Sequence, residues 1–260
     1  MNLVLIPSMF WGLAVVAAMM FAVWLASLVR RDASLVDRVW GFGFVLLGWF
    51  YFAVSPSPHL LPAVLATVWG LRLSVHLTRR NWGHGEDRRY ADMRKKHGGY
   101  FALFSLFSVY LVQAVLLWII AFPLLMGARG ILSGPGGAAL VVAGVVLWLI
   151  GFLFEAVGDH QLARFKRDPA NRNKVLDTGL WHYTRHPNYF GDMLVWWGLY
   201  LLAAAAGAWW TIFAPILMTL FLARVSGVTL LEKHLNESRP GYRDYVNRTS
   251  ALIPLPPRHS

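Results

Sequence analysis

The 260-residue chain contains no cysteine, and this absence removes several classes of site at once. Without a thiol there is no disulfide framework, no thiolate nucleophile and no cysteine-based metal site. The sequence also has neither a P-loop nor a glycine-rich dinucleotide fingerprint that follows a strand. Histidines and acidic residues are present, but no pair of them has the spacing that is typical of metal ligands. The basic residues lie beside apolar runs rather than on a separate domain, which disfavours nucleic-acid binding.

Charged residues are also scarce. Only 14% of the residues are Asp, Glu, Lys or Arg, and 13 acids stand against 24 Lys and Arg, for a formal net charge of +11. Hydrophobic residues make up 57% of the chain and come in long runs, which indicates an integral membrane protein. The excess of positive charge is typical of cytoplasmic loops beside anionic headgroups, and it could also serve an anionic cofactor.

The apolar runs predict an all-α, polytopic membrane protein with seven transmembrane helices. Each run is about as long as a helix needs to cross a bilayer, and paired arginines, prolines or glycines separate the runs. The fifth helix should continue as a polar helix to Lys166, and residues 81–99 should form a charged loop. The predicted spans are residues 3–29, 35–54, 60–78, 101–127, 138–157, 191–206 and 208–225.

Seven spans place the connecting segments alternately on two sides of the membrane. One side receives the N-terminus and the turns near residues 55–59, 127–137 and 207, and its only Lys or Arg is Arg129. The other side receives the remaining basic segments and the tail. Because positively charged loops stay in the cytoplasm, we expect an external N-terminus and a cytoplasmic C-terminus.

Asp37 begins a polar face inside the second predicted span. Trp40, Gly41 and Phe44 follow it at helical spacing, so a carboxylate would lie beside an aromatic wall with one gap. This pattern is compatible with a functional role for Asp37. It is equally compatible with a helix cap or with a simple ion pair to Arg38.

The third and fifth predicted spans carry further charged faces. Trp69, Arg72 and His76 line one face of the third span, and an interior position of Arg72 is favoured over snorkelling to the headgroups. Glu155 and Asp159 lie one turn apart in the fifth span, where like charges repel. Either cations compensate these acids or the acids accept hydrogen bonds from a ligand. A solvated helix end is the alternative.

Residues 176–192 concentrate polar and aromatic side chains directly before an apolar run. Pro187 suits the first turn of a helix, which places Asn188 and Asp192 one turn apart on one face. Gly191 allows a close approach to the backbone. Because Arg and His precede this helix start, the segment is either an anion site or a membrane-interface anchor. Its position at the cytoplasmic level of the three polar faces favours the ligand site.

Several motifs resemble the steroid 5α-reductase superfamily, in particular its bacterial branch, and the related sterol C14 reductases. Thr-Gly-Leu-Trp at residues 178–181 and Thr-Arg-His-Pro-Asn-Tyr-Phe-Gly-Asp at 184–192 are similar to the signature of these membrane reductases. Leu-Glu-Lys-His at 231–234 resembles the end of the same proteins. Val-Asp-Arg-Val-Trp-Gly at 36–41 and Glu-Asp-Arg-Arg-Tyr at 86–90 resemble the bacterial branch.

The C-terminal signature also resembles a second enzyme class. Isoprenylcysteine carboxyl methyltransferases and phospholipid methyltransferases carry a similar Arg-His-Pro-x-Tyr-x-Gly segment, followed by a glutamate and paired tyrosines. In them the site holds S-adenosylmethionine. Asn188, Asp192 and the N-terminal half of this sequence are closer to the reductases.

The resemblance implies NADPH at the cytoplasmic end of the helices and a lipophilic enone that enters from the bilayer. In the reductases, hydride passes from the nicotinamide to the β-carbon of an activated C=C bond while an acid polarises the carbonyl. Asp37, buried and protonated, would be that acid. The implied cofactor residues are Arg88, Glu155, Asp159, Lys166, Arg172, Trp181, Arg185, His186, Asn188, Tyr189, Asp192, His234 and Tyr242.

One departure from the family pattern concerns the partner of this acid. The steroid reductases pair a glutamate of the second helix with a tyrosine of the third. Here the acid is Asp37, and the third span has Trp69 and no tyrosine. Either another group, such as Arg72 or Tyr90, then supplies the second donor, or the substrate is not a 3-keto steroid. The implied catalytic residues are Asp37, Arg72 and Trp69.

These observations predict a single integral membrane reductase domain over residues 1–260. Residues 1–100 would face the substrate, and residues 101–260 would form most of the cofactor site. The predicted activity is NADPH-dependent reduction of a C=C bond in a steroid-like or other lipophilic enone. The alternatives are a membrane methyltransferase that uses S-adenosylmethionine and a non-catalytic sterol- or lipid-binding protein. We expect contacts with membrane lipids but no metal, nucleic acid or obligatory protein partner, in a bacterial inner membrane with the active site facing the cytoplasm.

Overall fold

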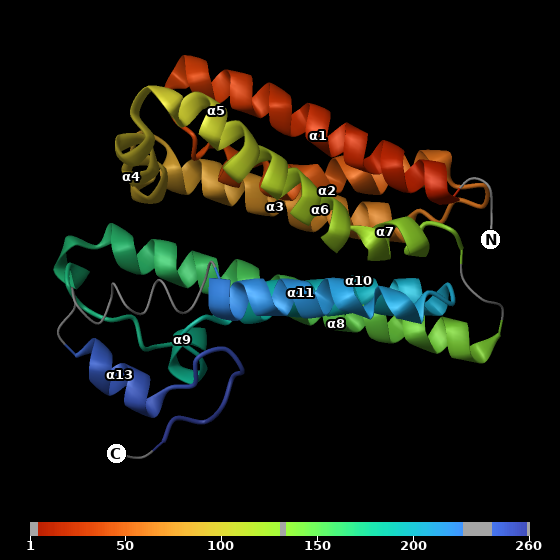
Figure 1. Cartoon of the computed structure of the whole chain (residues 1–260). Coiled ribbons are helices and arrows are strands. Elements are labelled where there is room, and N and C mark those ends of the chain that lie inside the picture. The colour runs from red at the N-terminus through yellow and green to blue at the C-terminus, as the bar shows by residue number, and fades with distance from the viewer. Residues whose placement is uncertain (1–4, 131–133, 226–240, 259–260) are drawn as a thin grey trace. The chain divides into compact units, whose positions relative to one another are not determined.

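The computed structural model describes residues 5–130, 134–225 and 241–258, and every regular element in these ranges is a helix. One isolated β-bridge joins Thr184 to Ser250. The chain divides into two compact units (Figure 1). The first unit comprises Met1–Gly137 with Leu202–Thr211, and the second comprises Ala138–Leu201 with Ile212–Ser260.

The first unit is a bundle of long apolar helices (Figure 1). Helices α1 (Leu5–Arg30) and α3 (Leu61–Asn81) pack against α2 (Leu35–Val54), and a continuous helical segment, Arg88–Gly127, packs against α1 and α2. This segment consists of α4 (Arg88–His97), η1 (Gly98–Tyr100), α5 (Phe101–Ser105), the π-helical η2 (Leu106–Leu111), α6 (Val112–Ile120) and α7 (Phe122–Gly127).

Two glycines allow α2 and α3 to pack closely. A Cβ atom on Gly41 would lie 2.5 Å from the carbonyl oxygen of Gly70, so this contact has no room for a side chain. Beside it, the rings of Phe44 and Trp69 pack with centroids 5.7 Å apart, and both side chains are buried. The α2–α3 crossing therefore fixes the aromatic face that follows Asp37 along α2.

The second unit is built around α8 and α10 (Figure 1). α8 (Pro135–Arg167) begins just before this unit, and α10 (Pro187–Ala205) starts at the proline that the sequence places in a first helical turn. The other elements from residue 168 onward are η3 (Pro169–Asn171), α9 (Leu180–Tyr183), η4 (Trp209–Ile212), α11 (Phe213–Leu220), the π-helical η5 (Phe221–Val225) and α13 (Tyr242–Arg248).

Glycines also bring α8 and α10 into backbone contact. A Cβ atom on Gly151 would lie 2.5 Å from the carbonyl oxygen of Gly191, and one on Gly198 would lie 2.6 Å from that of Gly144. Gly191 in turn faces the backbone of Glu155. The close approach predicted at Gly191 is therefore present, and the group that approaches is the backbone of α8.

Five segments in the described part of the chain are long and apolar enough to cross a membrane, and they confirm the first five predicted spans. The sixth and seventh predicted spans correspond to α10 and to the shorter apolar helix Trp209–Arg224. The number seven and the orientation therefore stay predictions. The five segments are Leu5–Arg30, Leu35–Val54, Leu61–Asn81, Arg88–Gly127 and Pro135–Arg167.

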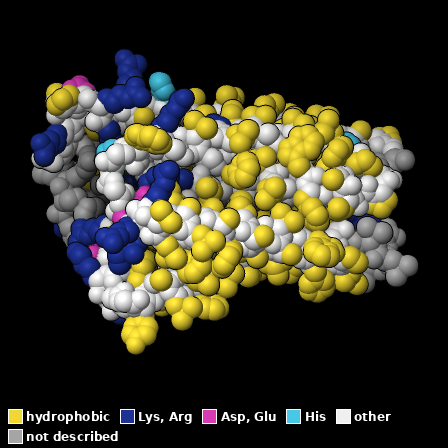
Figure 2. All heavy atoms as spheres, turned by 90° about the horizontal axis from the view of Figure 1, so that it is seen from above, with side chains coloured by type: hydrophobic (Ala, Val, Ile, Leu, Met, Phe, Trp, Pro, Cys, Tyr) yellow, Lys and Arg dark blue, Asp and Glu magenta, His cyan; other side chains and the backbone are white. Residues whose placement is uncertain are grey.

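The distribution of side chains agrees with a membrane protein. Figure 2 shows hydrophobic side chains along the visible face, with Lys and Arg gathered at one end. On α1, the side chains of Phe10, Trp11 and Phe21 are exposed. Large apolar side chains on the outer face of an apolar helix suit contact with lipid tails, so the chain is an integral membrane protein.

The charged segment before the fourth predicted span differs from its prediction. Residues 81–99 are not a loop throughout, because they contain α4. Asp87 caps this helix by accepting the backbone N–H of Arg89 at 3.0 Å. Basic residues fill the last turn of α4 and complement the helix dipole. By contrast, the predicted polar extension of the fifth span to Lys166 is confirmed, since α8 ends at Arg167.

Candidate functional site

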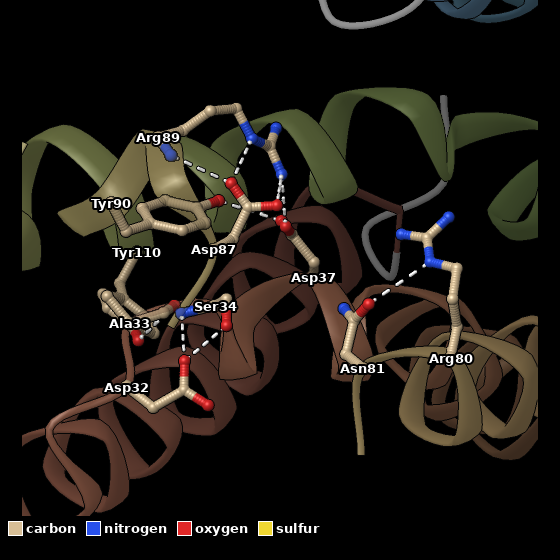
Figure 3. A network of polar contacts seen from close by, with 10 residues as sticks. All are labelled: Asp32, Ala33, Ser34, Asp37, Arg80, Asn81, Asp87, Arg89, Tyr90 and Tyr110. Atoms are coloured by element: carbon tan, nitrogen blue, oxygen red, sulfur yellow. Dashed lines mark hydrogen bonds and ion pairs between the residues drawn. The ribbon is translucent and has the colours of Figure 1, made fainter. Parts of the chain in front are cut away.

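Asp37 lies in the first turn of α2, and two donors from α4 reach its carboxylate (Figure 3). The Tyr90 hydroxyl donates to Oδ1 at 2.9 Å, and Nη2 of Arg89 donates to Oδ2 at 2.8 Å. Tyr90 is buried, whereas the Arg89 side chain is 51% exposed. Because both carboxylate oxygens accept hydrogen bonds, one of them from a cation, these contacts favour the ionised form of Asp37. The resemblance, in contrast, implies a protonated acid.

Arg89 also binds Asp87, so one guanidinium bridges two carboxylates (Figure 3). Nε of Arg89 donates to Oδ1 of Asp87 at 3.0 Å, the same oxygen that caps α4. Burial alone would raise the pKa of Asp87, but the hydrogen bonds from Arg89 outweigh burial and hold this pKa below its ordinary value. Asp87 is therefore a carboxylate at neutral pH.

Glu86 and Arg94 fasten α4 to the residues just before α2. Arg94 donates through Nε and Nη2 to the two Glu86 oxygens at 2.9 and 2.7 Å, and the Ala33 N–H donates to Oε1 of Glu86 at 2.8 Å. Burial would raise the pKa of Glu86, but the hydrogen bonds from Arg94 and Ala33 hold it below its ordinary value. The Tyr110 hydroxyl donates to the Ala33 carbonyl at 3.0 Å. This clamp keeps Tyr90 and its neighbour beside Asp37.

Sequence reasoning missed the clamp. Glu86 lies 53 residues from Ala33, and a backbone N–H partner leaves no trace in the sequence. The one available signal was the presence of two acids, Glu86 and Asp87, directly before a segment rich in arginine.

The other two predicted catalytic residues lie on α3. Trp69 is buried against Phe44, and Trp40 packs edge-on to Phe44 with centroids 4.9 Å apart. Arg72 is half-buried, three residues further along α3. Of the two candidates for the second donor, Tyr90 is hydrogen-bonded to Asp37. Trp69 of α3 extends the aromatic face that the α2 pattern predicts, through its contact with Phe44.

In the second unit, α8 and α10 bring four of the predicted cofactor residues onto facing sides. Asn188 Nδ2 donates to Oδ1 of Asp159 at 3.1 Å. Glu155, Asp159 and Asp192 are only 3%, 6% and 8% exposed. The Asn188 amide oxygen is buried and has no hydrogen-bond partner among the described residues. The cluster therefore offers a buried acceptor that an amide or hydroxyl donor of a ligand would satisfy.

Arg185 is buried, and its guanidinium holds the C-terminal tail. Nη1 donates to the carbonyl oxygen of Val246 at 3.1 Å and to that of Thr249, while the Arg185 N–H donates to the Ser250 carbonyl at 2.8 Å. A charged donor satisfies buried carbonyl groups well because it supplies several N–H groups in a fixed plane. Arg185 therefore organises the tail, and the anion contact that the resemblance implies for it stays a prediction.

Trp181 and Tyr242 belong to the same junction. Nε1 of Trp181 donates to the Gly158 carbonyl at 3.1 Å, and the Trp181 carbonyl accepts a hydrogen bond from the Tyr245 hydroxyl. Tyr242 is buried, with its ring 5.9 Å from that of Tyr245. Burial raises the pKa of Tyr245, so its hydroxyl remains a donor across the physiological pH range.

The remaining predicted cofactor residues differ in exposure. His186 is buried and stacks on Tyr189 with ring planes 7° from parallel. Arg88, Lys166 and Arg172 are exposed, which suits contact with phosphates. His234 lies outside the described residues. Over the ranges that the structure covers, no group of three His, Asp or Glu side chains is arranged to hold a metal.

Residues 23–249 match the family described as "Protein of unknown function (DUF1295)", and the chain belongs to this family. The match takes in both Asp37 with its α4 partners and the α8–α10 cluster. Uncharacterized protein C594.04c of Schizosaccharomyces pombe is 27% identical to the chain over 262 residues, which cover 89% of this chain and 75% of that protein.

Part of the chain is also similar to 3-oxo-5-alpha-steroid 4-dehydrogenase 1 of mammals. The Bos taurus protein is 28% identical over 114 residues, covering 44% of this chain and 41% of that enzyme. The Mus musculus protein is 30% identical over 114 residues, covering 44% and 42%. The match thus spans about two fifths of these enzymes, and no solved structure matches the chain. These similarities confirm the resemblance to the steroid 5α-reductases and indicate a reductase-like membrane enzyme.

Proposed function

We propose that the protein is an NADPH-dependent membrane reductase that saturates an activated C=C bond in a steroid-like or other lipophilic enone. The observation that carries this proposal is the Asp37–Tyr90 pair, an acid and a phenol joined by a hydrogen bond of 2.9 Å at the end of a buried aromatic face. The similarity to dehydrogenases named for 3-oxo steroids supports a substrate with a carbonyl conjugated to the reduced bond.

The first unit would bind the substrate. When hydride adds to the β-carbon of an enone, negative charge develops on the carbonyl oxygen, and positioned donors stabilise it. Asp37 in its protonated form is the donor that we assign to this oxygen, and Tyr90 would hold the Asp37 carboxyl group in position by donating to its Oδ1. Phe44 and Trp69 would contact the apolar body of the substrate. The Trp40 indole N–H is buried without a hydrogen-bond partner among the described residues, so it offers a further donor.

The second unit would bind most of the cofactor, which supplies the hydride. The unpartnered amide oxygen of Asn188 fits an N–H donor such as the nicotinamide carboxamide. The buried carboxylates of the α8–α10 cluster would accept hydrogen bonds from ribose hydroxyls. Lys166 and Arg172 would meet phosphate groups, for which the forked guanidinium of arginine is well suited. Arg88 of the first unit would do the same.

Cofactor choice is the sharpest test of the proposed function. We expect NADPH to raise the melting temperature of the purified protein in detergent and S-adenosylmethionine to leave it unchanged. A shift with S-adenosylmethionine alone would contradict the reductase and favour the methyltransferase. A shift with a sterol and with neither nucleotide would favour a non-catalytic lipid-binding protein.

Turnover is the second readout. With a 3-oxo-4-ene steroid as probe, Asp37→Asn should lower kcat by about 100-fold or more, the size of effect expected for a lost transition-state donor. The same variant should keep the NADPH-induced thermal shift. Asp244→Asn, an exposed acid in the first turn of α13, is the matched control and should keep both. Loss of the thermal shift in Asp37→Asn would assign Asp37 to the cofactor instead.

We also propose that the N-terminus lies outside and that the polar ends of the helices face the cytoplasm of a bacterial cell. Because the chain has no cysteine, single cysteines report this orientation without a background signal. Ser57→Cys should react with a membrane-impermeant maleimide in intact cells, and Asp244→Cys only after permeabilisation. The reverse pattern would overturn the orientation.

A further inference from the structure

Arg89 lies between two carboxylates of different origin. Asp37 comes from α2, and Asp87 is the N-cap of the helix that carries Arg89 itself. The guanidinium contacts Asp37 through Nη2 at 2.8 Å and Asp87 through Nε at 3.0 Å (Figure 3). We propose that Arg89 and Asp87 are positioning residues that control when Asp37 holds a proton, an inference that rests on the function proposed above.

The charges of Asp37, Asp87 and Arg89, called the trio below, explain how the protonation of Asp37 can be controlled. Two carboxylates and one guanidinium carry a net charge of −1, so one cation cannot neutralise both acids. When Asp37 takes up a proton, the remaining Arg89–Asp87 pair is neutral. A half-buried site tolerates a protonated acid beside a neutral ion pair better than it tolerates an uncompensated charge. Asp87 thus gives Arg89 a partner to keep when it releases Asp37.

The geometry assigns the movement to one side chain. The clamp of Glu86 with Arg94 and Ala33 fixes α4, and the backbone N–H of Arg89 is fixed on Asp87. The Arg89 side chain is 51% exposed, whereas that of Asp37 is 22% exposed. Arg89 therefore approaches Asp37 from the exposed side, and Tyr90 approaches from the buried side. Withdrawal of Nη2 opens Oδ2 of Asp37 and leaves the Tyr90 hydrogen bond in place.

The proton balance of the proposed reaction follows from this arrangement. A substrate carbonyl displaces Nη2 of Arg89, and a proton from solvent binds Oδ2 of Asp37, whose O–H then donates to the carbonyl oxygen. NADPH would supply the hydride that adds to the β-carbon, and the π electrons would move to the α-carbon and to the carbonyl oxygen, which accepts the hydrogen bond from Asp37. The Asp37 proton passes to the substrate, which gains one hydride and one proton while NADPH becomes NADP⁺. Asp37 is again a carboxylate, and Arg89 rebinds it.

Other charged and titratable groups surround the trio and must stay constant in a test. On the α4 side these are Glu86 and Arg94, which bind each other. On the α2 side, Asp32 and Arg38 bind each other, and Arg80 of α3 acts on Asp87. Tyr110 of η2 also lies in the field of Asp37. The variants that we choose leave all of these unchanged.

Two substitutions should move the protonation of Asp37 in opposite directions. Arg89→Gln removes the cation, so Asp37 should bind its proton at a pH higher by about one unit, since a contacting charge typically shifts a carboxyl by one to three units. Asp87→Asn leaves Arg89 to Asp37 alone, so the protonation midpoint should fall. Asparagine caps a helix as well as aspartate does, which keeps α4 intact. Lys95→Gln, an exposed change in the last turn of α4, should shift nothing.

Infrared difference spectroscopy of the protein without substrate measures this directly. The C=O stretch of a protonated carboxyl that disappears in Asp37→Asn identifies Asp37, and its growth is followed against pH in each variant. Opposite shifts for Arg89→Gln and Asp87→Asn support the proposal. Equal midpoints in both variants and in the unchanged protein overturn it, and so do shifts in the same direction.

Kinetic measurements distinguish a failure of the roles assigned to Arg89 and Asp87 from a failure of the proposed reductase activity. If the protein reduces enones, the alkaline limb of kcat/KM should move up in Arg89→Gln and down in Asp87→Asn by the same amounts as the infrared midpoints. A purely structural role would lower activity without moving the limb. If the protein does not oxidise NADPH, the proposed function fails, while the infrared titration still decides whether Arg89 and Asp87 set the charge of Asp37.

Discussion

The Tyr245 hydroxyl donates a hydrogen bond to the backbone carbonyl of Trp181, and this contact joins α13 to α9. Both side chains are buried. The contact connects the polar segment before α10 to a helix more than sixty residues later in the chain, so it links the tail to the start of α10.

Removal of this hydroxyl should destabilise the second unit. We expect Tyr245→Phe to lower the free energy of unfolding by about 1–3 kcal/mol, because the Trp181 carbonyl loses its donor inside the protein. Thermal unfolding of the detergent-solubilised protein measures the loss. Tyr183→Phe is the control, since the Tyr183 side chain is 48% exposed, and its melting temperature should be unchanged. An equal melting temperature for Tyr245→Phe would show that the tail does not support the unit.

A methyl group at Gly191 should prevent α10 from packing on α8. A Cβ atom there meets the backbone of Glu155 and Gly151, which cannot move aside as a flexible side chain can. We expect Gly191→Ala to lower the free energy of unfolding by about 1–3 kcal/mol, the typical effect of overpacking, and to reduce the yield of folded protein. Gly136→Ala, where a Cβ atom meets nothing within 4 Å, should be neutral or slightly stabilising.

The exposed arginines should discriminate between the two nicotinamide nucleotides. NADPH differs from NADH by a 2′-phosphate, so a residue that binds this group contributes only to NADPH affinity. We expect Arg172→Ala and Arg88→Ala to raise the Kd for NADPH about tenfold, equivalent to about 1.4 kcal/mol, and to leave that for NADH nearly unchanged. Isothermal titration with both nucleotides measures this, with Arg243→Ala on the exposed side of α13 as control. An equal increase of both Kd values would show that these arginines do not bind the 2′-phosphate.

Glu86 should make the stability of the first unit sensitive to acid. Its pKa in the folded protein lies below the ordinary value of 4.5, so its contribution is present above pH 4.5 and is lost as the pH falls through the lower folded value. Glu86→Gln should therefore be less stable at pH 7, and its unfolding free energy should decline less steeply below about pH 4.5. Asp92→Asn, whose side chain is 60% exposed, should follow the unchanged protein. Parallel curves for Glu86→Gln and the unchanged protein would contradict the clamp.

The helices and several polar faces were predictable from the sequence because their causes are local. Apolar runs, the proline at position 187 and the spacing of Asn188 and Asp192 act within one helix, and α10 has all three features. The helix within residues 81–99 was not predicted, because the many charged residues of that segment are typical of a loop. The Asp87 cap, which helps to start the helix, was not recognised.

Contacts between segments far apart in the chain could not be predicted from the sequence. Arg185 donates to carbonyls 61 and 64 residues away, and Asp37 accepts from Tyr90 53 residues away. A sequence pattern indicates that a buried cation or acid needs a partner, but the partner is chosen by the tertiary fold. The departure from the reductase pattern suggested Arg72 or Tyr90 as the second donor, and the structure shows a hydrogen bond from Tyr90 to Asp37.

The backbone contacts of α8 with α10 also restrict motion. Gly151 meets Gly191, and Gly144 meets Gly198, two helical turns further along. Rolling or sliding one helix would drive carbonyl groups into the other at both heights, so the pair moves as one rigid body. If the buried carboxylates and Asn188 bind the cofactor as proposed, we expect neighbouring elements of the second unit, such as α9 and α13, to control access to them. Substitutions at the α9–α13 junction should change the rates of ligand entry and exit more than the affinity.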